Sequence, residues 1–339
     1  MSGERTQPVR LGFLGTGWIG RHRMQAVLDS GLAIAAAVAD PDPACLDQAT
    51  ELAPQAARCP DLDALLDLDL DGVVIATPSA SHAAQSIQAL QRGMAVFCQK
   101  PLGRDHDEVA AVVAAAASCD RLLGVDLSYR HLKGMAQVRS LIQDGALGRI
   151  YAVQSAFHNA YGPDKEWFYQ RALSGGGCLI DLGVHLIDLA LWLLGHPAVE
   201  GVTGRCFTAG EPLSRRPQAV EDYATARLDL AGNIAMDLAC SWKLPLGTDA
   251  EILLRIFGSD GAISLRNING SFYDFVIEHV QGQSRTTLAE PPDAWGGKAL
   301  ISWTEQLRTC AAYDPSIQSV LEVSQVLDRI YADAAQQRP

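Results

Sequence analysis

The sequence predicts an α/β protein with two domains: an N-terminal domain built on a doubly wound parallel sheet, and a C-terminal α+β domain with a large open, mostly antiparallel sheet. Three observations lead to this prediction. Strand and helix patterns alternate over residues 1–125, a glycine-rich turn joins the first strand to the first helix, and short alternating strands dominate residues 199–282.

Length and composition agree with two folded domains. A chain of 339 residues exceeds what a single core usually organises, and we place the two domains at residues 1–125 and 126–339. The apolar fraction of 48% suffices for buried sheets, and 19% charged residues is low for a disordered chain. The formal net charge of −12, without a run of Lys or Arg, argues against a nucleic-acid or membrane partner.

Targeting signals and cysteine usage point to a cytoplasmic protein. The N-terminus lacks an apolar signal core, and no uninterrupted apolar run reaches the length that spans a bilayer. The eight cysteines are scattered singly, and no C-x-x-C occurs. We therefore expect buried, reduced thiols and neither a disulfide framework nor a zinc site.

The first strand, 9–14, runs directly into a glycine-rich turn and a helix over 19–30. A G-x-G-x-x-G pattern is informative in this strand–turn–helix context. Gly15 allows the tight turn, Gly17 allows close approach of a pyrophosphate, and Gly20 lets the helix pack on the strand. The candidate dinucleotide-binding residues of this turn are Gly15, Gly17, Trp18, Ile19 and Gly20.

The second strand, 33–39, ends in Asp40, twenty residues after Gly20. A carboxylate at this place suits the adenosine ribose hydroxyls and repels a 2′-phosphate, so NAD is favoured over NADP. The alternative is that Asp40 is a turn residue before Pro41.

Polar residues follow the next buried strand, 72–76. Thr77 and Pro78 lie in the loop at its carboxyl end, where ligands of open α/β sheets bind. His82 lies in the first turn of the helix that continues to Arg92, and it either touches the cofactor or is a surface histidine.

A further strand, 94–98, leads into Gln99, Lys100 and Pro101. A lysine that emerges from the end of a buried strand is unusual for a surface residue, and Pro101 restricts the backbone of Lys100 to extended conformations. Helices over 44–53, 61–68 and 107–119 and a strand over 121–125 complete a Rossmann domain.

The second domain opens with Tyr129 and Arg130, followed by a helix over 133–143 and a strand over 149–158. Arg130 either supports the site or forms a structural salt bridge. A polar, aromatic loop over 159–169 then suits either a polyhydroxylated ligand or a dimer contact. Its candidate substrate residues are Tyr161, Lys165 and Trp167.

A helix over 178–194 begins after a glycine turn and ends at Gly195. Asp181, His185 and Asp188 are spaced by four and three residues, so they share one face of this apolar helix. Buried polar groups cost desolvation unless something uses them. The alternative is that Asp181 caps or orients the helix start and that His185 is a core histidine.

The same region offers weak support for a metal site. His158, Cys178, Asp181 and His185 do not follow a recognised ligand spacing, so we predict none. The rest of the domain is read as strands over 199–208, 222–230, 233–242, 250–257, 262–266 and 271–280, a loop over 283–298, and a closing helix over 315–335 that we expect to pack back on the Rossmann domain.

Together these motifs resemble the Gfo/Idh/MocA oxidoreductases, which include glucose–fructose oxidoreductase and inositol 2-dehydrogenase. The resemblance runs essentially from end to end. It rests on the turn 15–20, on Asp40, on Thr77-Pro78 with His82, on 99–101, on Tyr129-Arg130, and most specifically on Gly175-Gly-Gly-x-x-x-Asp181-x-Gly-x-His185-x-x-Asp188.

The resemblance implies NAD(P), a C-terminal domain with an open sheet, and homodimers or homotetramers built partly through that sheet. It assigns catalysis to Lys100, Asp181 and His185. To the candidate cofactor-binding residues we add Thr77, Pro78, His82, Gln99, Lys100 and Arg130. This chain departs at Gln99, where the family usually has glutamate, which removes a negative charge near Lys100.

We therefore predict an NAD(P)-dependent dehydrogenase or reductase (EC 1.1.1.-) that transfers a hydride between the nicotinamide and a secondary alcohol or carbonyl of a sugar, cyclitol or related polyhydroxy compound. Two alternatives come from other classes of protein: an NAD-dependent glycosidase of the same fold, and a non-catalytic dinucleotide-binding regulator.

Overall fold

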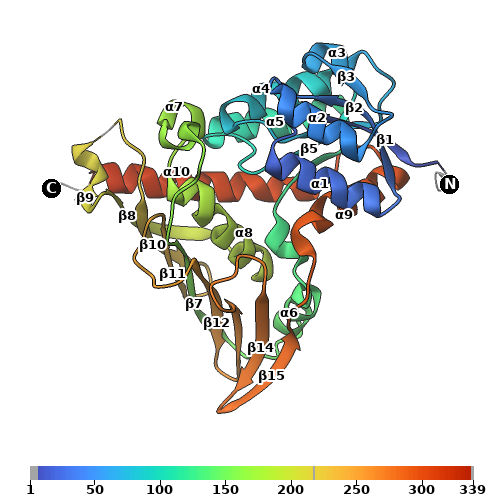
Figure 1. The fold of residues 1–339 in the computed structure, drawn as a ribbon. Helices are drawn as coiled ribbons and strands as arrows, with labels where there is room; N and C mark the ends of the chain where they lie inside the picture. Colours follow the sequence, from blue (N-terminus) through green and yellow to red (C-terminus); the bar gives the residue numbers. More distant parts are fainter. Residues whose placement is uncertain (1–6, 217, 337–339) are drawn as a thin grey trace. The chain divides into compact units, whose positions relative to one another are not determined.

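The computed structural model describes residues 7–216 and 218–336, and the chain divides into two compact units (Figure 1). Unit 1 comprises Met1–Ser128 and Gly296–Gln318, and unit 2 comprises Tyr129–Trp295 and Ser319–Pro339. The expected domains, 1–125 and 126–339, are each continuous in the sequence. They therefore do not include the finding that residues 296–318 belong to the first unit. Packing of the closing helix on the Rossmann domain stays a prediction.

Unit 1 contains a six-stranded parallel sheet in the order β3-β2-β1-β4-β5-β6. The order reverses between β1 and β4, the switch point at which doubly wound sheets bind ligands. This topology confirms the predicted Rossmann domain. The strands are Val9–Leu14 (β1), Ala33–Ala39 (β2), Ala57–Cys59 (β3), Gly72–Ile75 (β4), Ala95–Cys98 (β5) and Leu123–Val125 (β6).

Several helices of unit 1 begin where aspartates supply N-caps. The side chains of Asp42, Asp61 and Asp105 each accept a backbone N–H in the first turn of the helix that follows. The helices are Trp18–Asp29 (α1), Pro43–Leu52 (α2), Leu62–Leu66 (α3), Ser79–Gln91 (α4), His106–Cys119 (α5) and Lys298–Thr309 (α9), with a 3-10 turn at Pro315–Gln318 (η6).

Helix α9 is an element that the sequence analysis did not predict. Its Trp303 packs against Gly124 of β6 and Gly72 of β4, where an added Cβ would lie 2.5 and 2.8 Å from the indole. The ring of Trp303 also lies 5.7 Å from that of Phe97 in β5. Two glycines in neighbouring parts of the sheet thus make room for a helix from much later in the chain.

Unit 2 contains a nine-stranded sheet in the order β15-β14-β13-β12-β7-β11-β10-β8-β9. The β7–β11 ladder is parallel and the other ladders are antiparallel, which confirms a mostly antiparallel sheet. The predicted loop over 283–298 is wrong, because β15 lies within it at the sheet edge. The strands are Ile150–Asn159 (β7), Val199–Thr208 (β8), Glu211–Pro212 (β9), Tyr223–Leu230 (β10), Ile234–Ser241 (β11), Ala250–Gly258 (β12), Ala262–Asn267 (β13), Phe275–Gln281 (β14) and Ser284–Ala289 (β15).

Two helices cover one face of this sheet. α10 packs against β8 and α8, and the buried side chains of α8 lie in the core of unit 2. The predicted helix over 178–194 begins with a π-helical segment, η3, a feature that is frequent at functional sites. The helical segments are Ser128–His131 (η1), Met135–Gln143 (α6), Glu166–Tyr169 (η2), Arg171–Ser174 (α7), Leu179–Gly183 (η3), Val184–Leu193 (α8), Leu213–Arg215 (η4), Trp295–Gly297 (η5) and Ser319–Gln336 (α10).

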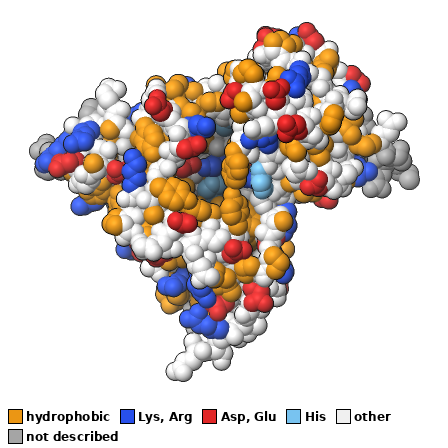
Figure 2. Space-filling model, in the orientation of Figure 1, with side chains coloured by type: hydrophobic (Ala, Val, Ile, Leu, Met, Phe, Trp, Pro, Cys, Tyr) orange, Lys and Arg blue, Asp and Glu red, His pale blue; other side chains and the backbone are white. Residues whose placement is uncertain are grey.

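Among residues 7–216 and 218–336, one segment, Arg171–Leu193, is long and apolar enough to cross a membrane by length and composition. Its most apolar window is 83% buried within the protein, and its buried side chains belong to the core of unit 2. Acidic and basic side chains are interspersed on the face that Figure 2 shows.

Candidate active site

The glycine turn of unit 1 is shaped by close backbone contacts. Gly15 has a φ of +84°, and an added Cβ there would lie 2.6 Å from the backbone of Ala76. A Cβ at Gly20 would lie 2.1 Å from the carbonyl oxygen of Gly15, whereas a Cβ at Gly17 would meet nothing within 4 Å. The turn is therefore packed on its inner side and open at Gly17, at the start of α1. The neighbouring Trp18 is 61% exposed, and Ile19 is half-buried.

Asp40 holds this turn in place. Its Oδ2 accepts a hydrogen bond from the backbone N of Thr16 at 2.6 Å, and its Oδ1 accepts one from the N of Asp42 at 2.9 Å. Asp40 therefore acts as a turn residue. Its role in ribose recognition stays a prediction, since the half-buried carboxylate retains exposed surface.

His82 is buried, so the alternative of a surface histidine is wrong. Its Nδ1 lies 2.7 Å from the carbonyl oxygen of Pro101, and its Nε2 lies 2.7 Å from that of Thr77. Burial lowers the pKa of His82, and the two carbonyl oxygens oppose that shift. His82 thus ties the loop that contains Pro78 to the segment after Lys100. Its direct contact with a cofactor stays a prediction.

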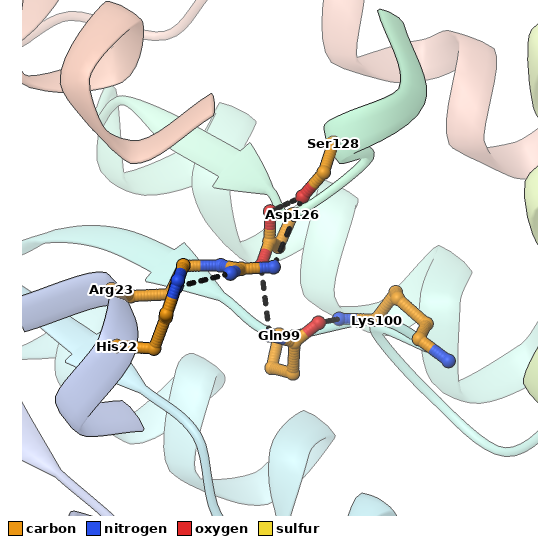
Figure 3. Close-up of polar contacts among 6 residues, drawn as sticks. All are labelled: His22, Arg23, Gln99, Lys100, Asp126 and Ser128. Atoms are coloured by element: carbon orange, nitrogen blue, oxygen red, sulfur yellow. Dashed lines mark hydrogen bonds and ion pairs between the residues drawn. The ribbon is translucent and has the colours of Figure 1, made fainter. Parts of the chain in front are cut away.

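Lys100 follows β5 at the carboxyl edge of the parallel sheet (Figure 3). Its backbone N donates to Oε1 of Gln99 at 2.9 Å, and the Lys100–Pro101 peptide bond is cis. The amide of Gln99 donates in turn to Oδ2 of Asp126 at 2.8 Å. Asp126 also forms an ion pair with Arg23 of α1, whose Nε lies 2.6 Å away, and neither residue was predicted from the sequence.

Asp181 of η3 is held by a tryptophan. The indole Nε1 of Trp242 donates to Oδ2 of Asp181 at 3.1 Å, and Trp242 is 2% exposed. The ring of His185 lies 4.9 Å from that of Tyr129. Burial raises the pKa of Tyr129, so it stays protonated at neutral pH. Unit 2 therefore combines a half-buried carboxylate in η3 and a half-buried imidazole in α8.

The start of η3 is fixed by Glu221, which the sequence analysis did not identify. Its Oε1 accepts the backbone N–H groups of Gly177 and Leu179 at 2.8 and 2.9 Å and the hydroxyl of Tyr331 at 2.8 Å. Glu221, and not Asp181, thus satisfies these backbone donors.

Arg130 and Asp188 form an ion pair within unit 2. Nε of Arg130 donates to Oδ2 of Asp188 at 2.9 Å, and Asp188 is buried. This is the structural salt bridge considered for Arg130. Its predicted role at the cofactor is untested.

The three candidate substrate residues lie in the loop over 159–169, which contains η2. Tyr161 is exposed, with its ring 6.0 Å from that of Phe272. Trp167 stacks on Phe168 with ring centroids 3.8 Å apart, while Lys165 lies 3.7 Å from its neighbour Asp164. Phe168 and Tyr169 reach Trp242, with centroids 6.3 and 5.6 Å apart, so this loop contacts the residue that holds Asp181.

Within residues 7–216 and 218–336, the structure contains no group of three or more His, Cys, Asp or Glu side chains that could hold a metal ion. The eight cysteines are free thiols. Lys100 belongs to unit 1, whereas Asp181 and His185 belong to unit 2, so that their joint action stays a prediction.

Two protein-family models match the two halves of the chain. Residues 9–127 match the oxidoreductase family with an NAD-binding Rossmann fold, and residues 135–264 match the GFO/IDH/MocA C-terminal domain. The rhizopine catabolism protein MocA of Rhizobium meliloti is 31% identical over 79% of this chain and 85% of its own length. D-Glucoside 3-dehydrogenase of Escherichia coli is also 31% identical, over 42% of this chain and 41% of that protein.

The fold is also found in solved structures. Levoglucosan dehydrogenase in complex with NADH and levoglucosan superposes with a TM-score of 0.82 at 22% identity, over 97% of this chain and 98% of that one. From the two domain matches and the likeness to MocA, the chain belongs to the Gfo/Idh/MocA family of oxidoreductases.

Proposed function

We propose that this protein is an NAD-dependent dehydrogenase or reductase acting on a secondary alcohol or carbonyl of a sugar, cyclitol or related polyhydroxy compound. One observation carries the proposal. Lys100 follows β5 at the same carboxyl edge of the parallel sheet at which β1 leads into the open glycine turn. A proton-transferring group and a phosphate-binding turn thus share one edge of unit 1.

The residues of unit 1 fit a dinucleotide. The backbone at Gly17 is open to a pyrophosphate, and the first turn of α1 presents N–H groups and the positive end of its dipole there. Asp40, at the end of β2, would accept hydrogen bonds from the adenosine ribose and repel a 2′-phosphate, which favours NAD over NADP. A bound nicotinamide supplies the acceptor or donor of the hydride.

In this proposal, side chains of the protein bind the reacting oxygen and accept the proton of the substrate hydroxyl. We assign to Lys100 Nζ a hydrogen bond to the reacting oxygen, and to His185 the acceptance or relay of the hydroxyl proton. Asp181, oriented by Trp242, would position the substrate hydroxyl. Tyr161, Lys165 and Trp167 would contribute the substrate wall, because aromatic rings stack on the C–H faces of sugars and Lys165 offers hydrogen bonds.

The relatives support this substrate class. MocA is named for rhizopine catabolism, and the names of two other relatives, D-glucoside 3-dehydrogenase and levoglucosan dehydrogenase, refer to a glucoside and to levoglucosan. We also propose a homodimer or homotetramer built partly through the nine-stranded sheet, which light scattering of the purified protein would test.

The test is NADH absorbance on mixing the protein and NAD, then NADP, with a panel of aldoses, glycosides and inositols. Lys100→Ala should lower kcat by about 10²–10⁴-fold, the range of general acid–base catalysis. Lys133→Ala, which removes an exposed lysine, is the matched control and should retain turnover. Asp40→Asn should weaken the preference for NAD over NADP.

Other outcomes decide between the alternatives. Release of free sugar from a glycoside without net NADH would indicate the NAD-dependent glycosidase. Binding of NAD without turnover across the panel, in either reaction direction, would indicate the regulator. Absence of NAD binding would overturn the proposal.

A further inference from the structure

Gln99 and Asp126 occupy equivalent places after two neighbouring parallel strands. β5 pairs with β6, and the backbone N of Asp126 continues the ladder by donating to the carbonyl oxygen of Cys98 at 2.9 Å. The side chains that follow then meet, with Nε2 of Gln99 donating to Oδ2 of Asp126 at 2.8 Å (Figure 3). The contact therefore arises from the register of the sheet.

Asp126 accepts hydrogen bonds from several directions. It is 1% exposed, and its carboxylate accepts from Nε of Arg23 at 2.6 Å and from the hydroxyl of Ser128. The charge of Arg23 compensates the buried carboxylate, so an ionised Asp126 offers acceptors and no donor. Position 99 must therefore supply a donor. An amide does so, whereas an ionised carboxylate would place two negative charges at hydrogen-bond distance.

The other end of the same amide reaches Lys100. Oε1 of Gln99 accepts the backbone N–H of Lys100 at 2.9 Å, and Figure 3 shows the side chain of Lys100 leaving the cluster with its Nζ away from Asp126. Because both ends of the amide are engaged, its orientation is fixed, and it links the Arg23–Asp126 ion pair to the backbone of Lys100.

We propose that Gln99 is a positioning residue: Asp126 orients its amide, and the amide fixes the backbone from which Lys100 reaches the reacting oxygen. This inference rests on the proposed function for the role of Lys100, and on the geometry of unit 1 alone for the linkage. It gives a physical reason for glutamine at this position, since Asp126 already supplies the negative charge.

A measurement without substrate tests the linkage. Reductive methylation with ¹³C-formaldehyde labels lysine amines for NMR, and Lys100→Arg identifies the Lys100 resonance. The chain's lysines are Lys100, Lys133, Lys165, Lys243 and Lys298. Gln99→Met removes both hydrogen bonds at similar volume, and we expect it to shift or broaden the Lys100 resonance while the other lysine resonances stay in place.

Activity gives a second, pH-dependent readout. Gln99→Met and Gln99→Glu should each lower kcat at neutral pH by about 10–10²-fold, with a smaller change in KM, because small misplacements of a reacting group are costly. When it is protonated, the carboxyl group that Gln99→Glu introduces can donate to Asp126 as the natural amide does. The kcat of this variant relative to the natural protein should therefore recover as the pH falls. The charged groups of this cluster are Arg23, Lys100, Asp126 and the titratable His22, whose Nδ1 lies 3.0 Å from Arg23.

Two controls separate positioning from general effects. The relative kcat of Gln99→Met should not depend on pH, and Gln91→Glu, which makes the same charge change at the exposed end of α4, should leave both the resonance and kcat unchanged. Thermal unfolding of each variant reports the folded fraction.

The outcomes are distinct. Gln99→Met and Gln99→Glu with an unmoved Lys100 resonance would overturn the linkage, and so would a relative kcat of Gln99→Glu that stays flat with pH. If the natural protein turns over no substrate while Gln99→Met shifts the Lys100 resonance, the proposed function fails and the linkage stands.

Discussion

Asp126 of unit 1 and Glu221 of unit 2 are carboxylates that are each 1% exposed, but their surroundings compensate them differently. In unit 1, Asp126 faces the guanidinium of Arg23 at 2.6 Å. In unit 2, Glu221 accepts hydrogen bonds from two backbone N–H groups and from the hydroxyl of Tyr331. Burial raises the pKa of Glu221, although these hydrogen bonds oppose the shift. A cation compensates the charge of a buried carboxylate directly, whereas neutral donors stabilise it only through hydrogen bonds.

The difference matters because each carboxylate lies one step from a proposed catalytic residue. Asp126 acts on Lys100 through Gln99, and Glu221 holds Leu179, two residues before Asp181. We expect the site around Asp126 to respond strongly when a charge is removed and the site around Glu221 to tolerate a neutral replacement.

The largest effect should come from Arg23→Met, which leaves Asp126 buried without its cation. Removing one partner of a buried pair costs about 3–5 kcal/mol of unfolding free energy. Chemical denaturation measures this change. Arg58→Met is the control, because the Arg58–Asp47 pair is largely exposed and should contribute less than about 1 kcal/mol. Equal losses in the two variants would contradict the assignment of Asp126 as a charge-compensated site.

The next effect is the contrast between two substitutions of Glu221. Glu221→Ala leaves buried donors without an acceptor and should cost about 3 kcal/mol, since each unsatisfied group costs roughly 1–3 kcal/mol. Glu221→Gln retains Oε1, the atom that accepts all three hydrogen bonds, and should stay within about 1 kcal/mol of the natural protein. The same denaturation experiment measures both, and a large loss in Glu221→Gln would show that the charge itself is needed.

The fold was predictable where it depends on local pattern. Strand–helix alternation and the glycine turn predicted the Rossmann sheet, and the comparisons and the strand order confirm it. Helix α9 was not predicted, because its Trp303 is buried against Gly72 and Gly124, which belong to strands far earlier in the chain. Strand β15 was not predicted, because its side chains are mostly exposed at a sheet edge and show no apolar alternation.

The sequence pattern selects candidate site residues, but it does not reveal which other residues they contact. Spacing selects Gly15, Asp40, Lys100 and Asp181, whose roles stay predictions. It does not reveal that Asp126 meets Arg23, 103 residues away, or that Trp242 donates to Asp181 across 61 residues. Those contacts depend on sheet register and on helix packing, which a local pattern does not encode. The sequence does show that Asp126 directly follows an apolar strand, and this position was the available signal for its contact with Arg23.

The smallest effect is a pair of opposite pH dependences. Burial, followed by the charge of Arg23, lowers the pKa of His22 below its ordinary 6.5, so its contribution to stability is present above pH 6.5 and is lost as the pH falls toward its folded pKa. The pKa of Glu221 is raised above its ordinary 4.5, so its contribution is present below pH 4.5 and is lost as the pH rises toward its folded pKa.

Thermal unfolding from about pH 4 to 8 separates the two groups when each variant is compared with the natural protein at the same pH. The Tm of His22→Asn relative to the natural protein should rise as the pH falls below 6.5, because the variant no longer resists protonation. The relative Tm of Glu221→Gln should rise as the pH increases above 4.5, because the variant no longer buries a charge. Differences that slope in the same direction would contradict the opposite pKa shifts of His22 and Glu221.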